Sequence, residues 1–357
     1  MKKYFVLSVV LIISASVFAQ IKHNKFATRI KFDQFNMSDF WQTEVTEIKD
    51  NSGYFLSNRK DGSGFNPSLV KLDVDGNKVF DTIYDMVPNN LGGFVNFQNA
   101  VTKTDNHTML YSTGSLQSQM SLAAPYIINV DTTGLINWQV GYYHDTLDLE
   151  AEKIIPTQDG GYLVCGTLYD WMNSIYVPSG YAMKLDNAGA LQWQSIYGEK
   201  DSMEIHFNDG IETPDGGFLF VGDAPNFQGG AKPPVPGNFD ILIDLVRTDN
   251  LGNVVWSKAM NLDNPIDPMY GFGHFSIDML DDTNAFISYS VYDTTNGGNE
   301  KFAITSLNVN TGINNWTKVY TLLSAGDINV RKSIASKNGD IIITSSDYSG
   351  SGTGVIF

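Results

Sequence analysis

The chain after its first residues is a succession of short apolar runs, rich in β-branched and aromatic residues and separated by Gly, Asp, Asn and Pro. In one stretch the runs span residues 151–156, 162–166, 181–185 and 191–197. Runs of this length between turn-forming residues are typical of β-strands, whereas no segment shows the period of an amphipathic helix. The pattern therefore predicts an all-β protein.

These runs belong to an internal repeat. Asp159-Gly-Gly-Tyr-Leu-Val-Cys-Gly166 recurs as Asp215-Gly-Gly-Phe-Leu-Phe-Val-Gly222, and weaker copies occur elsewhere. Five units also share a turn rich in Asp and Asn that ends in glycine, with an aromatic residue four positions later, and the glycines are spaced by 58, 55, 63 and 60 residues. Because they recur once per unit, we expect five structural docking aromatics: Phe80, Trp138, Trp193, Trp256 and Trp316.

Four strands per unit, repeated in tandem, predict a β-propeller of four-stranded blades in a single domain over residues 20–357. The expected repeats cover residues 41–85, 98–145, 151–198, 205–260, 271–320 and 327–357, which gives six blades. The sixth repeat stops before its outer strand. Two interpretations stay open: residues 26–34 close the ring from the N-terminal side, or the chain is a fragment of a longer protein with a further C-terminal sorting domain.

The first 19 residues indicate the compartment. Lys2 and Lys3, an apolar run and a small residue at Ala19 form the pattern of a secretory signal peptide, so we expect a protein that is secreted or at the cell surface, with no membrane span. The net charge of −16 disfavours nucleic acid as a partner. Cys165 is the single cysteine and lies in an apolar run, so we expect a buried thiol and no disulfide within the chain.

The repeat pattern resembles the propeller-type repeats of secreted Bacteroidetes proteins, in which Asp-Gly-Gly-Tyr is followed by Lys-Leu-Asp-x-x-Gly-x-x-x-Trp. The resemblance covers about residues 41–346 and implies type IX secretion by analogy. The segment Asn308-Val-Asn-Thr-Gly312 with Trp316 is also distantly similar to the tryptophan-docking motif of quinoprotein-like propellers. That family implies that the tryptophan packs between neighbouring blades, and it does not imply a quinone cofactor here.

Loop lengths distinguish the two faces of the predicted disc. The links between first and second strands and between third and fourth strands are short, whereas those between second and third strands are long and rich in aromatic residues. Functional residues on rigid scaffolds concentrate in such loops. The candidate ligand-binding residues are therefore on the long-loop face: Tyr142, Tyr143, His144, Tyr169, Trp171, Tyr176, Phe227 and Tyr270.

Other sites have weaker signals. The acidic turns at Asp73 and Asp186 resemble calcium loops, but Asp, Asn and Gly are also what a tight turn requires, so we expect turns and no cofactor. The five histidines lack metal-ligand spacing, and no motif singles out a catalytic residue. We therefore favour a secreted, monomeric, non-enzymatic scaffold that binds a protein or glycan. The alternative is an extracellular carbohydrate-active hydrolase or lyase with acidic residues near the central channel, and a quinone-dependent oxidoreductase is a third possibility.

Overall fold

The computed structural model describes residues 11–12, 44–48, 50–60, 66–84, 95–103, 105–114, 122–144, 146–170, 178–198, 205–225, 241–260, 267–268, 275–293, 299–321, 328–336, 339–347 and 353–356. These residues form strands, turns and connecting segments only, so the all-β prediction is confirmed for them. No described segment forms a helix with the length and hydropathy that a membrane span requires.

The described strands form six antiparallel sheets, here called sheets 1 to 6 in chain order. Sheet 1 contains β2 (Glu44–Glu47), β3 (Tyr54–Lys60), β4 (Asn66–Leu72) and β5 (Lys78–Ile83). Sheet 2 contains β6 (Val95–Thr102), β7 (Asn106–Gly114), β8 (Ala123–Asp131) and β9 (Ile136–Gly141). Sheet 3 contains β10 (Asp148–Pro156), β11 (Tyr162–Tyr169), β12 (Ser179–Leu185) and β13 (Leu191–Tyr197).

Sheets 4 to 6 follow the same scheme with additions. Sheet 4 contains β14 (His206–Glu212), β15 (Phe218–Pro225), β16 (Ile241–Thr248) and β17 (Val254–Met260). Sheet 5 contains β18 (Asp267–Pro268), β19 (Ser276–Met279), β20 (Asn284–Asp293), β21 (Asn299–Asn308) and β22 (Asn314–Thr321). Sheet 6 contains β23 (Ile328–Ala335), β24 (Ile341–Asp347), β25 (Thr353–Ile356) and β1 (Leu11–Ile12).

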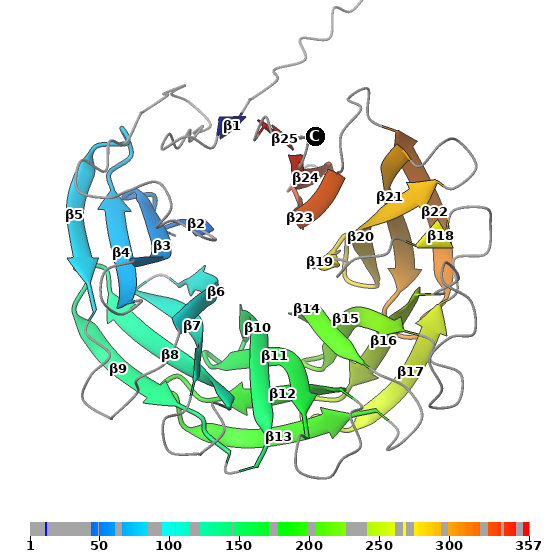
Figure 1. Ribbon diagram of the computed structural model, residues 1–357, viewed down its shortest axis with the longest axis horizontal. Coiled ribbons are helices and arrows are strands. Elements are labelled where there is room, and N and C mark those ends of the chain that lie inside the picture. The colour runs from blue at the N-terminus through cyan, green and yellow to red at the C-terminus, as the bar shows by residue number, and fades with distance from the viewer. Residues whose placement is uncertain are drawn as a thin grey trace, which may run out of the picture.

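The sheets stand around a common centre, with strands β2, β6, β10, β14, β19 and β23 innermost and β5, β9, β13, β17 and β22 outermost (Figure 1). Within each of sheets 1 to 4 the strands are hydrogen-bonded in chain order. Radial sheets with sequential strands define a β-propeller, so the predicted architecture is confirmed at that level.

The outer edge of sheet 6 is formed by a strand from the N-terminal end of the chain. Its fourth strand is β1, which pairs with β25 through Leu11 opposite Gly354 and Ile12 opposite Thr353. The strand at this edge thus comes from the predicted signal peptide, and residues 26–34 lie outside the described residues. Cleavage near Ala19 would remove β1 and leave this edge of β25 without that partner.

The docking aromatics pack so close to turn glycines of the next sheet that a side chain there would collide with the ring. A side-chain carbon added at Gly189 would lie 2.8 Å from the ring of Trp138, which belongs to the preceding sheet, and Gly252 has the same relation to Trp193. The indole of Trp138 also donates to the carbonyl oxygen of Asn187 at 3.1 Å. Both glycines have φ near +80°, which favours glycine independently of space.

All five docking aromatics are half-buried, and four of them, Phe80, Trp138, Trp193 and Trp256, lie against the turn glycine of the next sheet, so they differ from fully enclosed core residues. The repeat therefore encodes the contact between neighbouring sheets.

The core lies between adjacent sheets. Phe207 of sheet 4 stacks on Phe220 at 4.9 Å between ring centroids, and both belong to a cluster with Leu163 and Cys165 of sheet 3. The Cys165 thiol is fully buried, which confirms that prediction.

Candidate functional site

Four of the six innermost strands contain a register irregularity. Strands β6, β10, β14 and β23 each contain a register shift, in β10 between Ala151 and Lys153 and in β14 between Phe207 and Asp209. A β-bulge leaves the extra residue without a partner in the ladder and changes the direction of nearby side chains, and such bulges are frequent beside active sites. In sheet 3 the extra residue is Glu152.

The residues after these bulges join neighbouring sheets. Lys153 Nζ lies 3.1 Å from Asp209 Oδ1, and Asp209 Oδ2 accepts a hydrogen bond from Ser276 Oγ at 3.1 Å. Glu44 of sheet 1 pairs with Lys332 of sheet 6. Together with Asn99, whose Oδ1 accepts the Ile154 N–H of sheet 3, these side chains form what we call the inner belt: Glu44, Asn99, Lys153, Asp209, Ser276 and Lys332.

Lys153 is a charged member of the belt that is largely buried. Burial alone would lower its pKa, but the charges of Asp209 and Glu44 and the hydrogen bond to Asp209 raise it. Lys153 therefore remains a cation held by carboxylates, which is a structural arrangement.

Beside the belt lie four carboxyl groups, here called the inner carboxylate cluster: Asp148, Glu150 and Glu152 of β10 and Asp223 of β15. Burial and the charges of Glu150 and Asp223 raise the pKa of Glu152 to about 7. Burial and the charge of Asp148 also raise the pKa of Glu150. A carboxylic acid that keeps its proton near neutral pH is able to act as a general acid.

Two tyrosines border this cluster. Tyr169, at the end of β11, hydrogen-bonds to the Glu150 side chain, and its ring meets His206 of sheet 4 edge-on at 6.1 Å. Tyr181 of β12 is buried, and its hydroxyl has no hydrogen-bond partner among the described residues. Burial is the main cause of its raised pKa, and the charges of Cys165, Glu152 and Glu150 add to it. Both phenols are thus placed near the carboxyl groups.

Of the predicted ligand-binding residues, the structure brings Tyr169 to this cluster. Tyr142 instead packs against the core between sheets 2 and 3, and its hydroxyl donates to the carbonyl oxygen of Gly189. Tyr143 and His144 are exposed in the link between these sheets. The other four candidates lie outside the described residues: Trp171, Tyr176, Phe227 and Tyr270. A role in ligand binding stays a prediction for all of them.

The sequence analysis missed the inner carboxylate cluster. Glu150 and Glu152 stand two residues apart in a strand that had been recognised only from its apolar end, residues 151–156. The signal that could have revealed the cluster is the presence of acidic residues in an innermost strand, where apolar side chains that face the core are expected.

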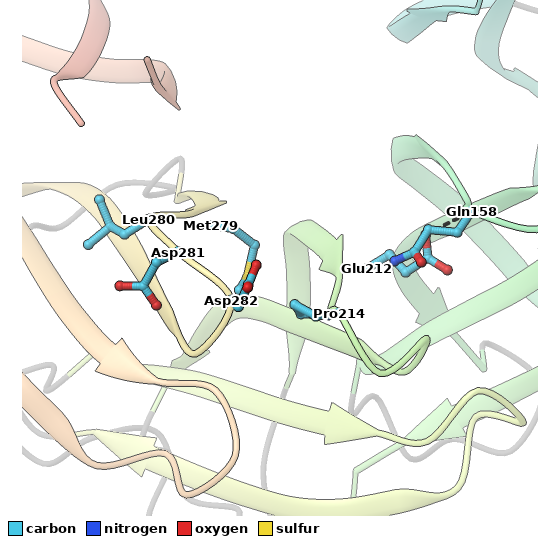
Figure 2. A pocket seen from close by; sticks show the side chains of 7 residues that line it. All are labelled: Gln158, Glu212, Pro214, Met279, Leu280, Asp281 and Asp282. Carbon is cyan, nitrogen blue, oxygen red and sulfur yellow. Dashed lines mark hydrogen bonds between the residues drawn. The ribbon is translucent and has the colours of Figure 1, made fainter. Parts of the chain in front are cut away.

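A separate hollow lies on the side of the short turns. It has a volume of about 400 Å³ and is lined by Gln158, Glu212, Pro214, Met279, Leu280, Asp281 and Asp282. Figure 2 shows Glu212 and Gln158 on one side, Met279 and Asp282 on the other, and Pro214 between them. The Gln158 N–H donates to Glu212 Oε2 at 2.7 Å.

The aspartates of the acidic turns accept hydrogen bonds from the backbone of their own turn. Asp73 Oδ1 accepts N–H bonds from Asp75 at 3.0 Å and Asn77 at 2.8 Å, and Asp186 Oδ1 accepts them from Ala188 and Ala190, both at 2.8 Å. Within the described ranges no group of three or more His, Cys, Asp or Glu residues is placed to hold a metal ion. The absence of calcium stays an expectation.

Comparison with known proteins adds information at the level of fold. No protein-family profile matches the sequence. No curated protein sequence matches it either. The structure is similar to an α-L-arabinanase from Penicillium chrysogenum complexed with arabinobiose, with a TM-score of 0.54 and 8% identity, over 99% of this chain and 98% of that chain.

It is also similar to the K499G mutant of NanB sialidase from Streptococcus pneumoniae, with a TM-score of 0.50 and 9% identity, over 89% of this chain and 67% of that chain. An endo-arabinase from Bacteroides thetaiotaomicron aligns with a TM-score of 0.44 and 13% identity, over 89% of this chain and 93% of that chain. At these identities the likeness shows a propeller fold.

These comparisons correct the favoured interpretation of the sequence. The chain was interpreted as a non-enzymatic binding scaffold, whereas the two propellers above that align with TM-scores of 0.54 and 0.50, an α-L-arabinanase and a sialidase, are enzymes. No sequence motif marks the inner carboxylate cluster, because three of its acids come from β10 and the fourth, Asp223, comes from β15 of the next sheet.

Proposed function

We propose that the protein is an extracellular glycoside hydrolase whose site is the inner carboxylate cluster at the boundary of sheets 3 and 4. The observation that carries this proposal is Glu152, a bulge residue of the innermost strand whose pKa is raised to about 7 beside Glu150 and Asp223. Hydrolysis of a glycosidic bond requires one carboxyl group that donates a proton and a second that activates water or attacks the sugar.

In this proposal Glu152 is the general acid. It donates its proton to the glycosidic oxygen as the bond between that oxygen and the anomeric carbon breaks. Asp223, from the neighbouring sheet, is the general base that takes a proton from the attacking water. Glu150 keeps the proton on Glu152 through its charge, and Tyr169 holds Glu150 by a hydrogen bond.

The substrate in this proposal is a neutral polysaccharide. The net charge of −16 and the cluster of four carboxyl groups repel an anionic glycan. Arabinan is the first candidate, because the similar structure from Penicillium chrysogenum is an arabinanase with bound arabinobiose. Arg247 is the arginine whose side chain is described. It is buried and paired with Asp215, so it does not offset the negative charge of the cluster.

We further propose that the six sheets are the blades of a closed six-bladed ring. The contact between Glu44 and Lys332 supports closure, because it joins the first and last sheets at the level of the inner belt. Secretion, the relation to Bacteroidetes repeats and type IX export remain proposals from the sequence.

The test is release of reducing sugar from arabinan, xylan and an acidic polysaccharide such as polygalacturonate. We expect the parent protein to cleave a neutral polymer, with a rate that falls as pH rises above about 7 because Glu152 then loses its proton. Glu152→Gln is expected to lower the rate by about 100-fold or more, and Asp223→Asn by a similar factor.

Asp105→Asn is the matched control, because Asp105 is an exposed turn residue of sheet 2 away from the cluster. It should leave the rate unchanged. Full activity of Glu152→Gln, or no cleavage of any polysaccharide by the parent, would contradict the proposal.

A further inference from the structure

Tyr181, beside the inner carboxylate cluster, ends in a hydrogen-bond donor that the fold does not use. Its side chain is buried, with 4% of the residue exposed, and its hydroxyl has no hydrogen-bond partner among the described residues. A buried hydroxyl without a partner loses its bonds to water and gains none in return, so such groups are rare in folded proteins. The position of this donor therefore requires a reason.

The register of sheet 3 places this side chain at the bulge of the innermost strand. Tyr181 lies opposite Gly166, and Gly166 lies opposite Ala151, the residue before the bulge. Opposed residues share one face of a sheet, with Cβ atoms about 5 Å apart. A side-chain carbon added at Gly166 would lie 2.0 Å from the carbonyl oxygen of Glu150. The backbone of β10 thus occupies the space beside Gly166, and no side chain of β11 separates it from the phenol.

Sheet 2 has a different arrangement at the same place. Its register shift follows Phe97, which lies opposite Tyr111, and Tyr111 lies opposite Tyr126. Tyr126 therefore holds the position of Tyr181, but two aromatic side chains stand between it and the centre. Of these two sheets, the one that contains Glu152 is the one in which both intervening residues are small.

The acids of β10 act on this hydroxyl. Burial raises the pKa of Tyr181, and the charges of Cys165 and of three carboxyl groups of β10 add to this effect. The phenol therefore keeps its proton at neutral pH and is a donor. Lys153, which follows Glu152 in β10, has its ammonium group bound to Asp209.

We infer that Tyr181 is a positioning residue whose hydroxyl donates a hydrogen bond to the carboxylate that Glu152 becomes when it gives up its proton. The inference rests on the proposed function, in which that proton passes to the glycosidic oxygen. The electron pair of the broken O–H bond stays on Glu152, so a negative charge forms beside those of Glu150 and Asp223. A donor that is already in place where charge develops stabilises the transition state without reorganisation. Tyr181 keeps its own proton throughout.

The hydrogen bond is tested through the pKa of Glu152, which is measured without any hydrolysis. The side-chain carboxyl resonance is followed in protein with ¹³C-labelled glutamate and assigned with Glu152→Gln. A hydrogen bond to the charged form favours that form, so Tyr181→Phe should raise the pKa of Glu152 by about one unit. Tyr126→Phe removes the hydroxyl at the same position of sheet 2 and should leave this pKa unchanged. Glu150 and Asp223, which also act on Glu152, are retained in both variants.

The rate of hydrolysis gives the second measurement. Tyr181→Phe should lower kcat by about tenfold with KM unchanged, because the donor acts on a charge that forms during the reaction. The fall in rate on the alkaline side should move to higher pH with the pKa of Glu152. Adding Tyr181→Phe to Glu152→Gln should cause no further loss, since the amide gains no charge. At about pH 5 Tyr181→Phe should melt no lower than the parent, because the hydroxyl that it lacks is unpartnered among the described residues.

The outcomes separate this inference from the proposed function. An unchanged pKa of Glu152 in Tyr181→Phe, or an equal rise in Tyr126→Phe, would overturn the inference whatever the rates are. If Tyr181→Phe alone raises this pKa while the parent cleaves no polysaccharide, the hydrogen bond is supported and the proposed function fails.

Discussion

Carboxyl groups of sheet 3 occur in two opposite environments. At the short turn, Asp159 accepts bonds from Lys184 and Thr157, which overcome the effect of burial and lower its pKa to about 2. In β10 of the same sheet, burial and neighbouring acids raise the pKa of Glu152 to about 7. The same functional group is therefore held as an anion at one end of the sheet and as a protonated acid along its innermost strand.

In the proposed function, this difference separates structural carboxylates from reactive ones. The turn carboxylates bind their own backbone and a repeat cation, so their charge contributes to folding. The inner carboxylates lie close to one another, so their charge opposes folding, and a fold retains such an arrangement where function requires it. The two pKa shifts have opposite directions, which makes the comparison testable.

The largest expected effect is on the inner belt, where an ion pair is buried. Asp209→Asn removes the partner of Lys153 and leaves an ammonium among few acceptors, so we expect the free energy of unfolding to fall by about 3 to 5 kcal/mol. Urea unfolding at neutral pH measures this change. The double variant Asp209→Asn with Lys153→Met should recover most of the loss, and a double variant as unstable as the single one would show that the charge is not the cause.

The next effect concerns Glu152 and has the opposite direction. Its folded pKa is about 7 against 4.5 for the ordinary side chain, so the stability from proton binding is present at low pH and is lost as pH rises between these values. Glu152→Gln removes this dependence. We expect it to match the parent near pH 4 and to exceed it by about 2 to 3 kcal/mol at pH 8. A pH-independent difference between the two proteins would contradict the raised pKa.

Much of the fold follows from the sequence because the repeat specifies local contacts. In four of the five units the aromatic four residues after the turn glycine, as in Trp193, packs on the turn glycine of the next sheet, and both residues are visible as a pattern. The inner carboxylate cluster is different, because Glu152 and Asp223 meet only when sheets 3 and 4 are side by side. The Glu44–Lys332 pair was also beyond the pattern, since it joins positions 288 residues apart.

The smallest effect compares the turn carboxylates of sheets 3 and 5. Asp159 has a side chain that is 53% exposed, so solvent screens its pair with Lys184, and Asp159→Asn should cost about 1 kcal/mol or less at pH 7. Because the folded pKa of Asp159 is lowered, this contribution is present above pH 4 and fades as pH falls towards 2.

Asp282→Asn removes the corresponding turn charge of sheet 5, where Ser306 stands at the strand position that Lys184 has in sheet 3. The free energy of unfolding of this variant should therefore differ from that of the parent by only a few tenths of a kcal/mol. Denaturant unfolding of both variants at pH 7 and pH 3 measures the contrast. Equal costs for the two substitutions would mean that Asp282 already has an internal cation, and the distinction between the turns of sheets 3 and 5 would then be lost.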